Sequence, residues 1–448
     1  MSPTASKPQF IITPVHESHV QAAVICSKTH GLQLKVRSGG HDYEGLSYLS
    51  NAPFVILDLV NLHAIDVNLK DETAWVQAGV TIGQVYHQIA NKSRTHGFPA
   101  GICPTLGVGG HLSGGGIGTM MRKYGIASDN VVDACLVDAN GRILDRKSMG
   151  EDVFWAIRGG GAASFGVVVS WKIRLVPVPP TVTVFTVAKT LQQGATELIH
   201  RWQEIADKFN ENLFIRIIIQ VVDGENKGEK TIRALFNSLF LGSVNELLPL
   251  METSFPELGL KAKDCMEISW LKSVLYFEGY PLGESVDVLM NRTRRTKYFF
   301  KAKSDFVKEP ISQMDLEGIW KMLLTGDKPM MIWDPLGGRL SEIPESESPF
   351  PHRAGNLYNI QYLVQWREGG TNVSEKHIEW MRNLYKYMEP YVSKFPRAAY
   401  LNYRDLDLGR NEEGNIGYSK ASVWGSKYFK NNFKRLVLAK TKIDPGFW

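Results

Sequence analysis

Glycine is concentrated in three clusters within the first 170 residues, and these clusters constrain the fold more than any other feature of the sequence. They cover residues 36–45 (VRSGGHDYEG), 101–118 (GICPTLGVGGHLSGGGIG) and 158–166 (RGGGAASFG). Such a density of glycine costs conformational entropy on folding unless the backbone needs a positive φ or must approach a ligand closely. The first two clusters also contain a histidine or a cysteine. If the clusters were only mobile loops, there would be no reason to find these reactive residues in them. The clusters therefore predict a ligand site in which consecutive backbone N–H groups face an anion.

The second cluster carries neither of the two common phosphate-binding motifs. Gly107-Val108-Gly109 begins a dinucleotide-binding fingerprint, but Leu112 stands where the third glycine belongs. No Gly-Lys-Ser/Thr sequence follows, as a P-loop would require. The pattern therefore favours an anion-binding loop of another kind.

The composition is that of an ordinary globular protein. Hydrophobic residues make up 44% and charged residues 22% of the 448 residues, and the net charge is +5. No apolar run approaches the roughly 18 residues that a membrane span needs. So weak a positive charge gives no reason to expect a nucleic-acid partner, and the short basic cluster at residues 292–297 is predicted to be a solvated surface. We expect a monomer that acts on a small molecule.

The cysteines give no sign of a metal site. The chain contains Cys26, Cys103, Cys135 and Cys265. None forms a C-x-x-C pair, so neither a zinc site nor a thioredoxin-like motif is predicted. Three N-x-S/T sequons, at Asn91, Asn291 and Asn372, are compatible with a secretory route.

Hydrophobic periodicity predicts an α+β chain. From about residue 9 to 176, short β-branched runs alternate with helical stretches, and Pro177, Pro179 and Pro180 then mark a boundary. Beyond it, apolar strands are followed by longer helices, which predicts a sheet covered by helices. Residues 357–366 alternate as a half-buried strand does. The other predicted elements include helices at 17–30, 82–95, 244–253, 284–292, 375–393 and 426–438 and a strand beginning at Ala399.

These motifs resemble a known family. RSGGHDYEG is followed, 62 positions after its histidine, by CPTLGVGGHLSGGG, and GGGAASFGVV, FPHRAG and AYLNYRDLDLG extend the match almost to the C-terminus. The chain resembles the berberine bridge enzyme-like flavoproteins of plants. The resemblance implies an α+β fold, with a two-part FAD-binding domain of the vanillyl-alcohol oxidase type and an α/β substrate domain whose antiparallel sheet is covered by helices. We expect the FAD-binding domain at 1–178, the substrate domain at 179–395, and a segment at 396–448 that returns to the first domain.

The resemblance also implies FAD bound through two covalent bonds. His41 would attach through a ring nitrogen to the 8α-methyl group, and Cys103 through its sulfur to C6 of the isoalloxazine. Imidazole and thiolate are side-chain nucleophiles able to add to an electron-poor ring. Relatives pair the residue equivalent to Cys26 with a cysteine nearer the N-terminus, which this chain lacks. We therefore expect a trimmed form of a secreted protein of the apoplast or vacuole, without its signal peptide.

Further residues are expected to hold the cofactor by contact alone. Backbone amides of the first cluster would bind the pyrophosphate, and the second cluster would line the ribityl chain. The expected cofactor-binding residues are Arg37, Ser38, Gly39, Gly40, Thr105, Gly107, Gly110, His111, Gly114, Gly161, Val167 and Asn402. Leu106 occupies the position that controls oxygen access in the family, and a leucine there predicts slow reaction with oxygen.

The expected reaction is removal of a hydride from the substrate to flavin N5. Tyr403 matches a tyrosine proposed as the base, and Gln361, Asn359 and Tyr43 are predicted to lie beside it. The predicted substrate pocket includes Ile117 and Trp333. Substrates would be plant alcohols, phenolics, terpenoids or alkaloids.

One departure from the family keeps alternatives open. Alcohol-oxidising relatives carry a tyrosine where this chain has Ile117 and a lysine where it has Asn359, which disfavours a monolignol-type activity. An oxidative or non-redox cyclase is the first alternative. A binding protein without turnover is the second, although His41 and Cys103 argue against it.

Overall fold

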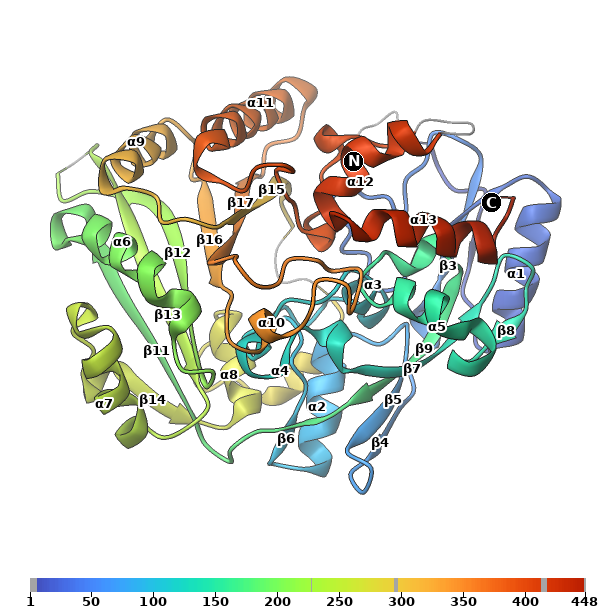
Figure 1. Cartoon of the computed structure of the whole chain (residues 1–448), viewed down its shortest axis with the longest axis horizontal. Helices are drawn as coiled ribbons and strands as arrows, with labels where there is room; N and C mark the ends of the chain where they lie inside the picture. The colour runs from blue at the N-terminus through green and yellow to red at the C-terminus, as the bar shows by residue number, and fades with distance from the viewer. Residues whose placement is uncertain (1–5, 227, 294–296, 412–416, 447–448) are drawn as a thin grey trace.

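The protein is described by a computed structural model that covers residues 6–226, 228–293, 297–411 and 417–446. Arg294 and Arg295, two of the four basic residues in the predicted solvated cluster, lie outside the described residues. The chain forms two halves that lie side by side (Figure 1). One half contains the N-terminal strands and the C-terminal helices, and the other is built on a large sheet from the middle of the chain.

The first half contains two main sheets. A parallel sheet has the order β1-β3-β2, formed by β1 (Phe10–Ile12), β2 (Gln33–Arg37) and β3 (Phe54–Asp58). An antiparallel sheet has the order β4-β5-β9-β7-β8, formed by β4 (Ile65–Asn68), β5 (Thr73–Gln77), β7 (Val131–Val137), β8 (Ile143–Leu144) and β9 (Val167–Arg174). A short pair joins β6 (His96–Gly97) to β10 (Val176–Pro177). The helices here are α1 (Glu17–Thr29), α2 (Ile82–Lys92), α3 (Val108–Ser113), α4 (Met121–Tyr124) and α5 (Arg146–Ile157).

The second half is built on a seven-stranded antiparallel sheet in the order β14-β11-β13-β12-β16-β17-β15. Its strands are β11 (Val182–Thr190), β12 (Leu213–Asp223), β13 (Lys230–Phe240), β14 (Cys265–Ile268), β15 (Phe299–Val307), β16 (Met330–Pro335) and β17 (Tyr358–Trp366). Its helices are α6 (Ala195–Ile205), α7 (Val244–Ser254), α8 (Trp270–Phe277), α9 (Gln313–Leu324), α10 (Arg339–Glu342) and α11 (Thr371–Tyr387). The predicted antiparallel sheet covered by helices is therefore confirmed.

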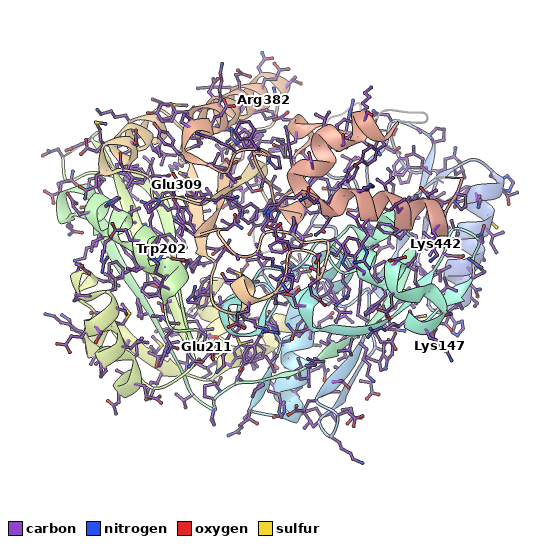
Figure 2. All side chains as sticks on the ribbon, in the orientation of Figure 1. Lys147, Trp202, Glu211, Glu309, Arg382 and Lys442 are labelled. Atoms are coloured by element: carbon purple, nitrogen blue, oxygen red, sulfur yellow. The ribbon has the colours of Figure 1, made fainter. Side chains whose placement is uncertain are left out.

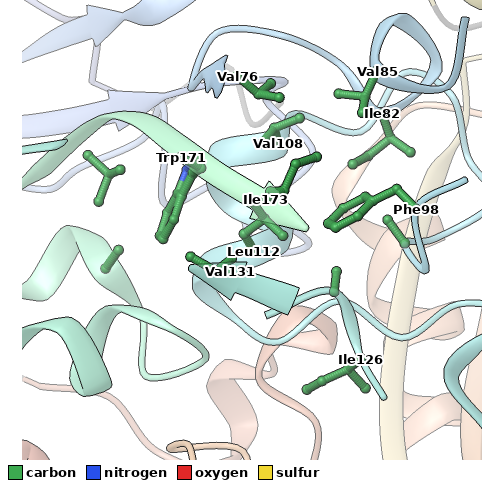
Figure 3. Packing of buried hydrophobic residues seen from close by; sticks show 14 of the residues in the cluster. Val76, Ile82, Val85, Phe98, Val108, Leu112, Ile126, Val131, Trp171 and Ile173 are labelled. Atoms are coloured by element: carbon green, nitrogen blue, oxygen red, sulfur yellow. The ribbon is translucent and has the colours of Figure 1, made fainter. Parts of the chain in front are cut away.

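Two apolar cores stabilise these halves. The first surrounds Trp171 on β9, and Figure 3 shows Val76, Val108, Leu112 and Ile173 packed near it. The second lies between the seven-stranded sheet and α6, α9 and α11. Trp202 of α6 packs there and donates from Nε1 to the carbonyl of Ile215 at 2.9 Å (Figure 2). Because the second core covers only one face of the sheet, the opposite face is left to line a cavity.

The C-terminal segment differs from its predicted structure. Instead of a strand beginning at Ala399, residues Leu401–Tyr403 form a 3₁₀ turn, closed by a hydrogen bond from the Tyr403 N–H to the Tyr400 carbonyl at 3.0 Å. The prediction failed because Tyr400 N bonds to the side chain of Ser304 at 2.9 Å rather than to a neighbouring strand. Residues Val286–Met290, predicted as a helix, likewise form a 3₁₀ helix.

The predicted basic helix at 426–438 is two helices. They are α12 (Tyr418–Phe429) and α13 (Asn432–Ile443), separated at Lys430, whose φ is 46°. The helices cross closely, since a Cβ added at Gly425 would lie 2.3 Å from the ring of Phe433. Both helices join the first core, so the chain ends in the half where it began. Within the described residues, no helix combines the length and apolarity that a membrane span requires.

Candidate active site

A cavity of about 940 Å³ lies where the two halves meet. Residues of all three glycine clusters form one wall, and the uncovered face of the seven-stranded sheet forms the other. Short turns at the C-terminal end of the chain, around Asn402 and Tyr403, complete the lining. This volume lies near the upper end of the roughly 300–1,000 Å³ typical of small-molecule sites.

The two predicted attachment residues lie close together on the cavity wall. The Thr105 hydroxyl lies 2.9 Å from His41 Nε2 and 3.6 Å from Cys103 Sγ. One hydroxyl thus contacts an imidazole and a thiol that are 62 positions apart in the sequence. All three residues line the cavity, as the sequence predicts.

The glycine loops pack backbone against backbone. A Cβ added at Gly107 would lie 2.1 Å from the nitrogen of Gly39, and a Cβ added at Gly39 would lie 2.3 Å from the nitrogen of Gly107. Gly40 has a φ of +68°, which an L side chain rarely adopts. At Gly110, in contrast, an added Cβ would meet nothing within 4 Å, so this backbone faces open space in the cavity. The loops form a bare backbone cradle of the kind that suits a pyrophosphate.

His111 and Asn402 join the glycine wall to the C-terminal segment. The Gly101 N–H donates to His111 Nε2 at 2.9 Å, and Asn402 Nδ2 donates to the His111 carbonyl at 3.0 Å. Burial lowers the pKa of His111 to about 4, so the ring is neutral near neutral pH. Asn402 also fills the space beside Gly114, where an added Cβ would lie 1.9 Å from the Asn402 amide oxygen. His111, Gly114 and Asn402 all line the cavity.

Three predicted catalytic residues form one polar and aromatic group. Gln361 Nε2 donates to the Tyr43 hydroxyl at 2.6 Å, and the rings of Tyr43 and Tyr403 are stacked with centroids 5.4 Å apart. Burial raises the pKa of Tyr403 well above its usual value, Tyr43 and Asp334 add to this effect, and Arg216 opposes it. Tyr403 is therefore protonated at neutral pH in the absence of a ligand.

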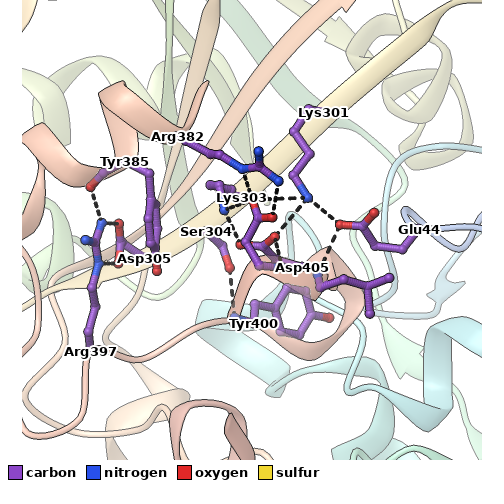
Figure 4. Close-up of polar contacts among 12 residues, drawn as sticks. Glu44, Lys301, Lys303, Ser304, Asp305, Arg382, Tyr385, Arg397, Tyr400 and Asp405 are labelled. Atoms are coloured by element: carbon purple, nitrogen blue, oxygen red, sulfur yellow. Dashed lines mark hydrogen bonds and ion pairs between the residues drawn. The ribbon is translucent and has the colours of Figure 1, made fainter. Parts of the chain in front are cut away.

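A buried cluster of charges holds the loop of Tyr43 against the segment of Tyr403 (Figure 4). Lys301 Nζ lies 2.5 Å from Glu44 and 2.9 Å from Asp405, and Lys303 Nζ lies 2.6 Å from Asp405. The Glu44 carboxylate also accepts from the Leu406 N–H at 3.1 Å. Glu44 follows Tyr43, and Asp405 follows Tyr403 by two residues, so β15 fixes both tyrosine-bearing segments through two lysines.

Four predicted site residues do not line the cavity, and these predictions are corrected as follows. Trp333 points to the helix-covered face of the sheet, where it stacks on Tyr358 at 4.8 Å, because adjacent residues of a strand face opposite sides. Asn359 shares a face with Gln361 but is fully buried, and its amide donates to the Asp305 carbonyl at 2.9 Å.

The other two lie in the first half. Arg37 pairs with Asp58 at 2.5 Å, and Val167 packs into the first core while Gly166 and Val168 line the cavity. Gly161, Leu106 and Ile117 line the cavity.

Sequence reasoning missed the charged residues of the sheet wall. Arg216, Asp334 and Glu278 line the cavity, together with the aromatic residues Phe214 and Phe300. Arg216 was visible as the single charge inside an apolar strand, LFIRIIIQVV, which is a recognisable signal. Asp334, between Trp333 and Pro335, gave no comparable signal.

The residues present fit FAD. His41 and Cys103 both lie beside the Thr105 hydroxyl, and the glycine loops offer backbone N–H groups. Residues of all three glycine clusters line the same cavity. When bound, this cofactor would supply the two-electron oxidation, and the protein would supply binding and orientation. Within the described residues, no group of acidic, histidine or cysteine side chains could hold a metal ion.

Comparison with known proteins supports this reading along the whole chain. The FAD binding domain family matches residues 8–146, and the berberine and berberine-like family matches residues 399–446. A tetrahydroberberine oxidase of Berberis wilsoniae is 56% identical over 450 residues, covering 100% of this chain and 84% of the relative. A monolignol oxidoreductase of Arabidopsis thaliana, AtBBE-like 13, is 55% identical over 448 residues, covering 99% and 83%. The crystal structure of Phl p 4, a grass pollen allergen with glucose dehydrogenase activity, matches with a TM-score of 0.93 at 47% identity, covering 99% of this chain and 89% of that chain.

Proposed function

Because the chain belongs to the berberine bridge enzyme-like family of FAD-linked oxidoreductases, we propose that it binds FAD covalently through both His41 and Cys103 and oxidises a plant alcohol, phenolic, terpenoid or alkaloid. The observation that carries the proposal is the contact of one hydroxyl, that of Thr105, with both side chains. A cofactor held at two points does not need a closed pocket to retain it, which leaves room for substrate in the same cavity.

The protein's own part in the reaction is orientation and proton transfer. When held by His41 and Cys103, FAD would supply the hydride acceptor for the substrate. Tyr43 and Gln361, joined by their 2.6 Å hydrogen bond, orient the substrate, and the stacked Tyr403 accepts the substrate's proton in its phenolate form. A neutral phenol is not a base, so Tyr403 acts only as its phenolate, after loss of its own proton to solvent. Because burial raises the pKa of Tyr403, this form is a small fraction at neutral pH. Arg216 is the nearby cation that stabilises the resulting charge.

Mass spectrometry of denatured protein tests the covalent attachment. We expect flavin on both the His41 and the Cys103 peptides, and a yellow precipitate after acid treatment. His41→Ala and Cys103→Ala should each keep one bond, and Cys265→Ala, at a half-buried cysteine outside the cavity lining, is the control. If both peptides are unmodified, the covalent part of the proposal fails.

A cyclase is the second candidate because the family's base pair is replaced. Ile117 lines the cavity, and Asn359 is buried with its amide bonded to the backbone, so neither acts as a base. Anaerobic mixing with substrate separates the two functions. Oxidation bleaches the flavin in step with product, whereas a non-redox cyclase forms product without bleaching.

We also propose that the protein is secreted and acts as a monomer without a nucleic-acid partner. The sequon residues Asn91, Asn291 and Asn372 are all exposed, as glycosylation requires. A mass shift of the three sequon peptides after glycosidase treatment would show the glycosylation that a secreted protein acquires. Light scattering measures the molar mass and so tests whether the protein is a monomer.

A further inference from the structure

A row of polar side chains crosses the cavity face of the seven-stranded sheet. Asn237 pairs in register with Thr186 on one side and Arg216 on the other, and Asp334 pairs with Asn359. Since Ile217 pairs with Trp333, Arg216 and Asp334 are the next residues along two neighbouring antiparallel strands, on the same face. The row ends in a cavity wall that also carries apolar side chains such as Ile332 and Leu363.

Arg216 is fixed in this row. Its Nε donates to Asn237 Oδ1 at 2.9 Å, its Nη2 lies 3.5 Å from the Phe277 carbonyl, and its guanidinium lies 5.0 Å from the centre of the Phe277 ring. Asn237 is itself oriented by donation to the Thr186 hydroxyl at 2.9 Å. Among the described residues, Nη1 has no acceptor, so one donor of this rigid group remains for a ligand.

Asp334 offers acceptors that the protein does not use. It is 7% exposed and lines the cavity, yet no described donor lies within hydrogen-bonding distance of its carboxylate. Its neighbour Asn359 is oriented by its own bond to the Asp305 carbonyl and does not approach it. Burial raises the pKa of Asp334 to about 6 and Arg216 opposes this, so the carboxylate is ionised at neutral pH. A buried carboxylate without a donor is unfavourable unless a ligand supplies one.

We propose that Arg216 and Asp334 form a substrate-binding subsite for a hydroxyl group of a neutral substrate. The hydroxyl O–H donates to the Asp334 carboxylate, and its oxygen accepts from Arg216 Nη1. The two charges cancel, and the nearby guanidinium repels an ammonium ion, so the pair selects a hydroxyl over a protonated amine. The rings of Phe214 and Phe300 on the same cavity wall suit an aromatic body. This inference rests on the proposed function, since it places the oxidised substrate in this cavity.

Binding to a reduced enzyme tests the subsite without turnover. The flavin-loaded protein is reduced with dithionite under anaerobic conditions and titrated by calorimetry with coniferyl alcohol, which is neutral and has two hydroxyl groups. Tetrahydroberberine, an amine without a hydroxyl group, is the second probe. Asp334→Asn removes the charge and keeps the shape. Asp223→Asn, at the exposed end of β12, is the matched control.

We expect Asp334→Asn to weaken coniferyl alcohol binding by about 10- to 100-fold, as loss of a hydrogen bond to a charged group does. Asp223→Asn should bind as the wild type does, and tetrahydroberberine binding should not change in either variant. An affinity for coniferyl alcohol that Asp334→Asn leaves within about twofold overturns the subsite.

Two further outcomes decide the subsite, and a third decides the proposed function. A larger loss for tetrahydroberberine than for coniferyl alcohol would show that Asp334 binds a cation and overturn the hydroxyl assignment. A wild type that retains flavin but binds no coniferyl alcohol overturns the subsite while leaving the proposed function standing. A wild type without covalent flavin defeats the proposed function itself.

Discussion

The two walls of the cavity are built in different ways. The wall of the glycine clusters presents backbone, and its shape depends on missing side chains, as at Gly39 and Gly107, where no Cβ fits. The sheet wall presents side chains such as Arg216, Asp334 and Gln361 at alternate positions of its strands. The backbone wall suits a constant ligand, the flavin, because almost any substitution disturbs it. The sheet wall can change residue by residue, which suits a substrate that differs between relatives.

A methyl group on the backbone wall should have the largest effect. Gly107→Ala places a Cβ 2.1 Å from the nitrogen of Gly39, and backbone on both sides cannot yield. We expect loss of flavin binding and of most soluble protein, measured by the ratio of flavin to protein absorbance. Gly283→Ala, where nothing lies within 4 Å, is the control. A fully yellow Gly107→Ala would show that the two loops do not need this contact.

The second-largest effect is expected from a substitution in the cluster of buried charges that links the two walls. Lys303→Met removes one of the two lysines that pair with the buried Asp405, and the side chains of Lys303 and Asp405 are each 2% exposed. The expected loss is about 3–5 kcal/mol of unfolding free energy. Arg339→Met, which removes an exposed ion pair with Glu342, should lose less than about 1 kcal/mol. Equal losses in thermal or urea denaturation would contradict the difference in burial.

A change on the sheet side of the site should slow the reaction and spare the cofactor. Tyr403→Phe keeps the stack on Tyr43 and removes the proton acceptor. We expect anaerobic flavin reduction to slow by about 100-fold, the general-base range, with the covalent flavin content unchanged. Stopped-flow absorbance measures the rate. An unchanged rate would remove Tyr403 from the mechanism.

The smallest effect should be a gain of stability at Asp334. Burial raises its pKa to about 6, above the usual 3.8, so the folded protein binds this proton more tightly than the unfolded chain does. The stabilising protonated form is complete below about pH 4 and is lost as the pH rises through about 6. Asp334→Asn should therefore raise the unfolding free energy by at most about 3 kcal/mol near pH 8 and leave it nearly unchanged near pH 4.

The charged and titratable groups that act on this carboxyl are Arg216 on β12 and Tyr400 and Tyr403 on the C-terminal segment. Thermal denaturation of both proteins at the two pH values measures the difference. A gain of equal size at both pH values would assign the effect to packing rather than to the charge.

The contrast between the walls also explains how far the sequence could be interpreted. The backbone wall follows the chain in continuous motifs, so His41, Cys103 and the glycines around them could be predicted from local residues. The sheet wall assembles strands that are not in chain order, so which side chains meet depends on a register that no local pattern contains. Trp333 was misplaced by a single residue, because only the pairing of β16 with its neighbours decides that Ile332 and Asp334 face the cavity.

The tail shows the same limit. NYRDLDLG was recognisable as a site segment. Its 3₁₀ turn, however, depends on a hydrogen bond to Ser304, which lies far earlier in the chain, and no local sequence pattern predicts such a contact. Asn359 illustrates the opposite case. Its face was predicted correctly from the period of two, but its burial depends on the contact with Asp305 on the neighbouring strand.

The C-terminal segment completes the lining of the cavity, although it lies far from the glycine clusters in the sequence. A ribosome adds Asn402 and Tyr403 long after it has added His41 and Cys103. Until the turn around Asn402 and Tyr403 is in place, the cavity lacks the third part of its lining. A chain that has not reached Asn402 therefore lacks part of the cavity in which we propose that the oxidation takes place.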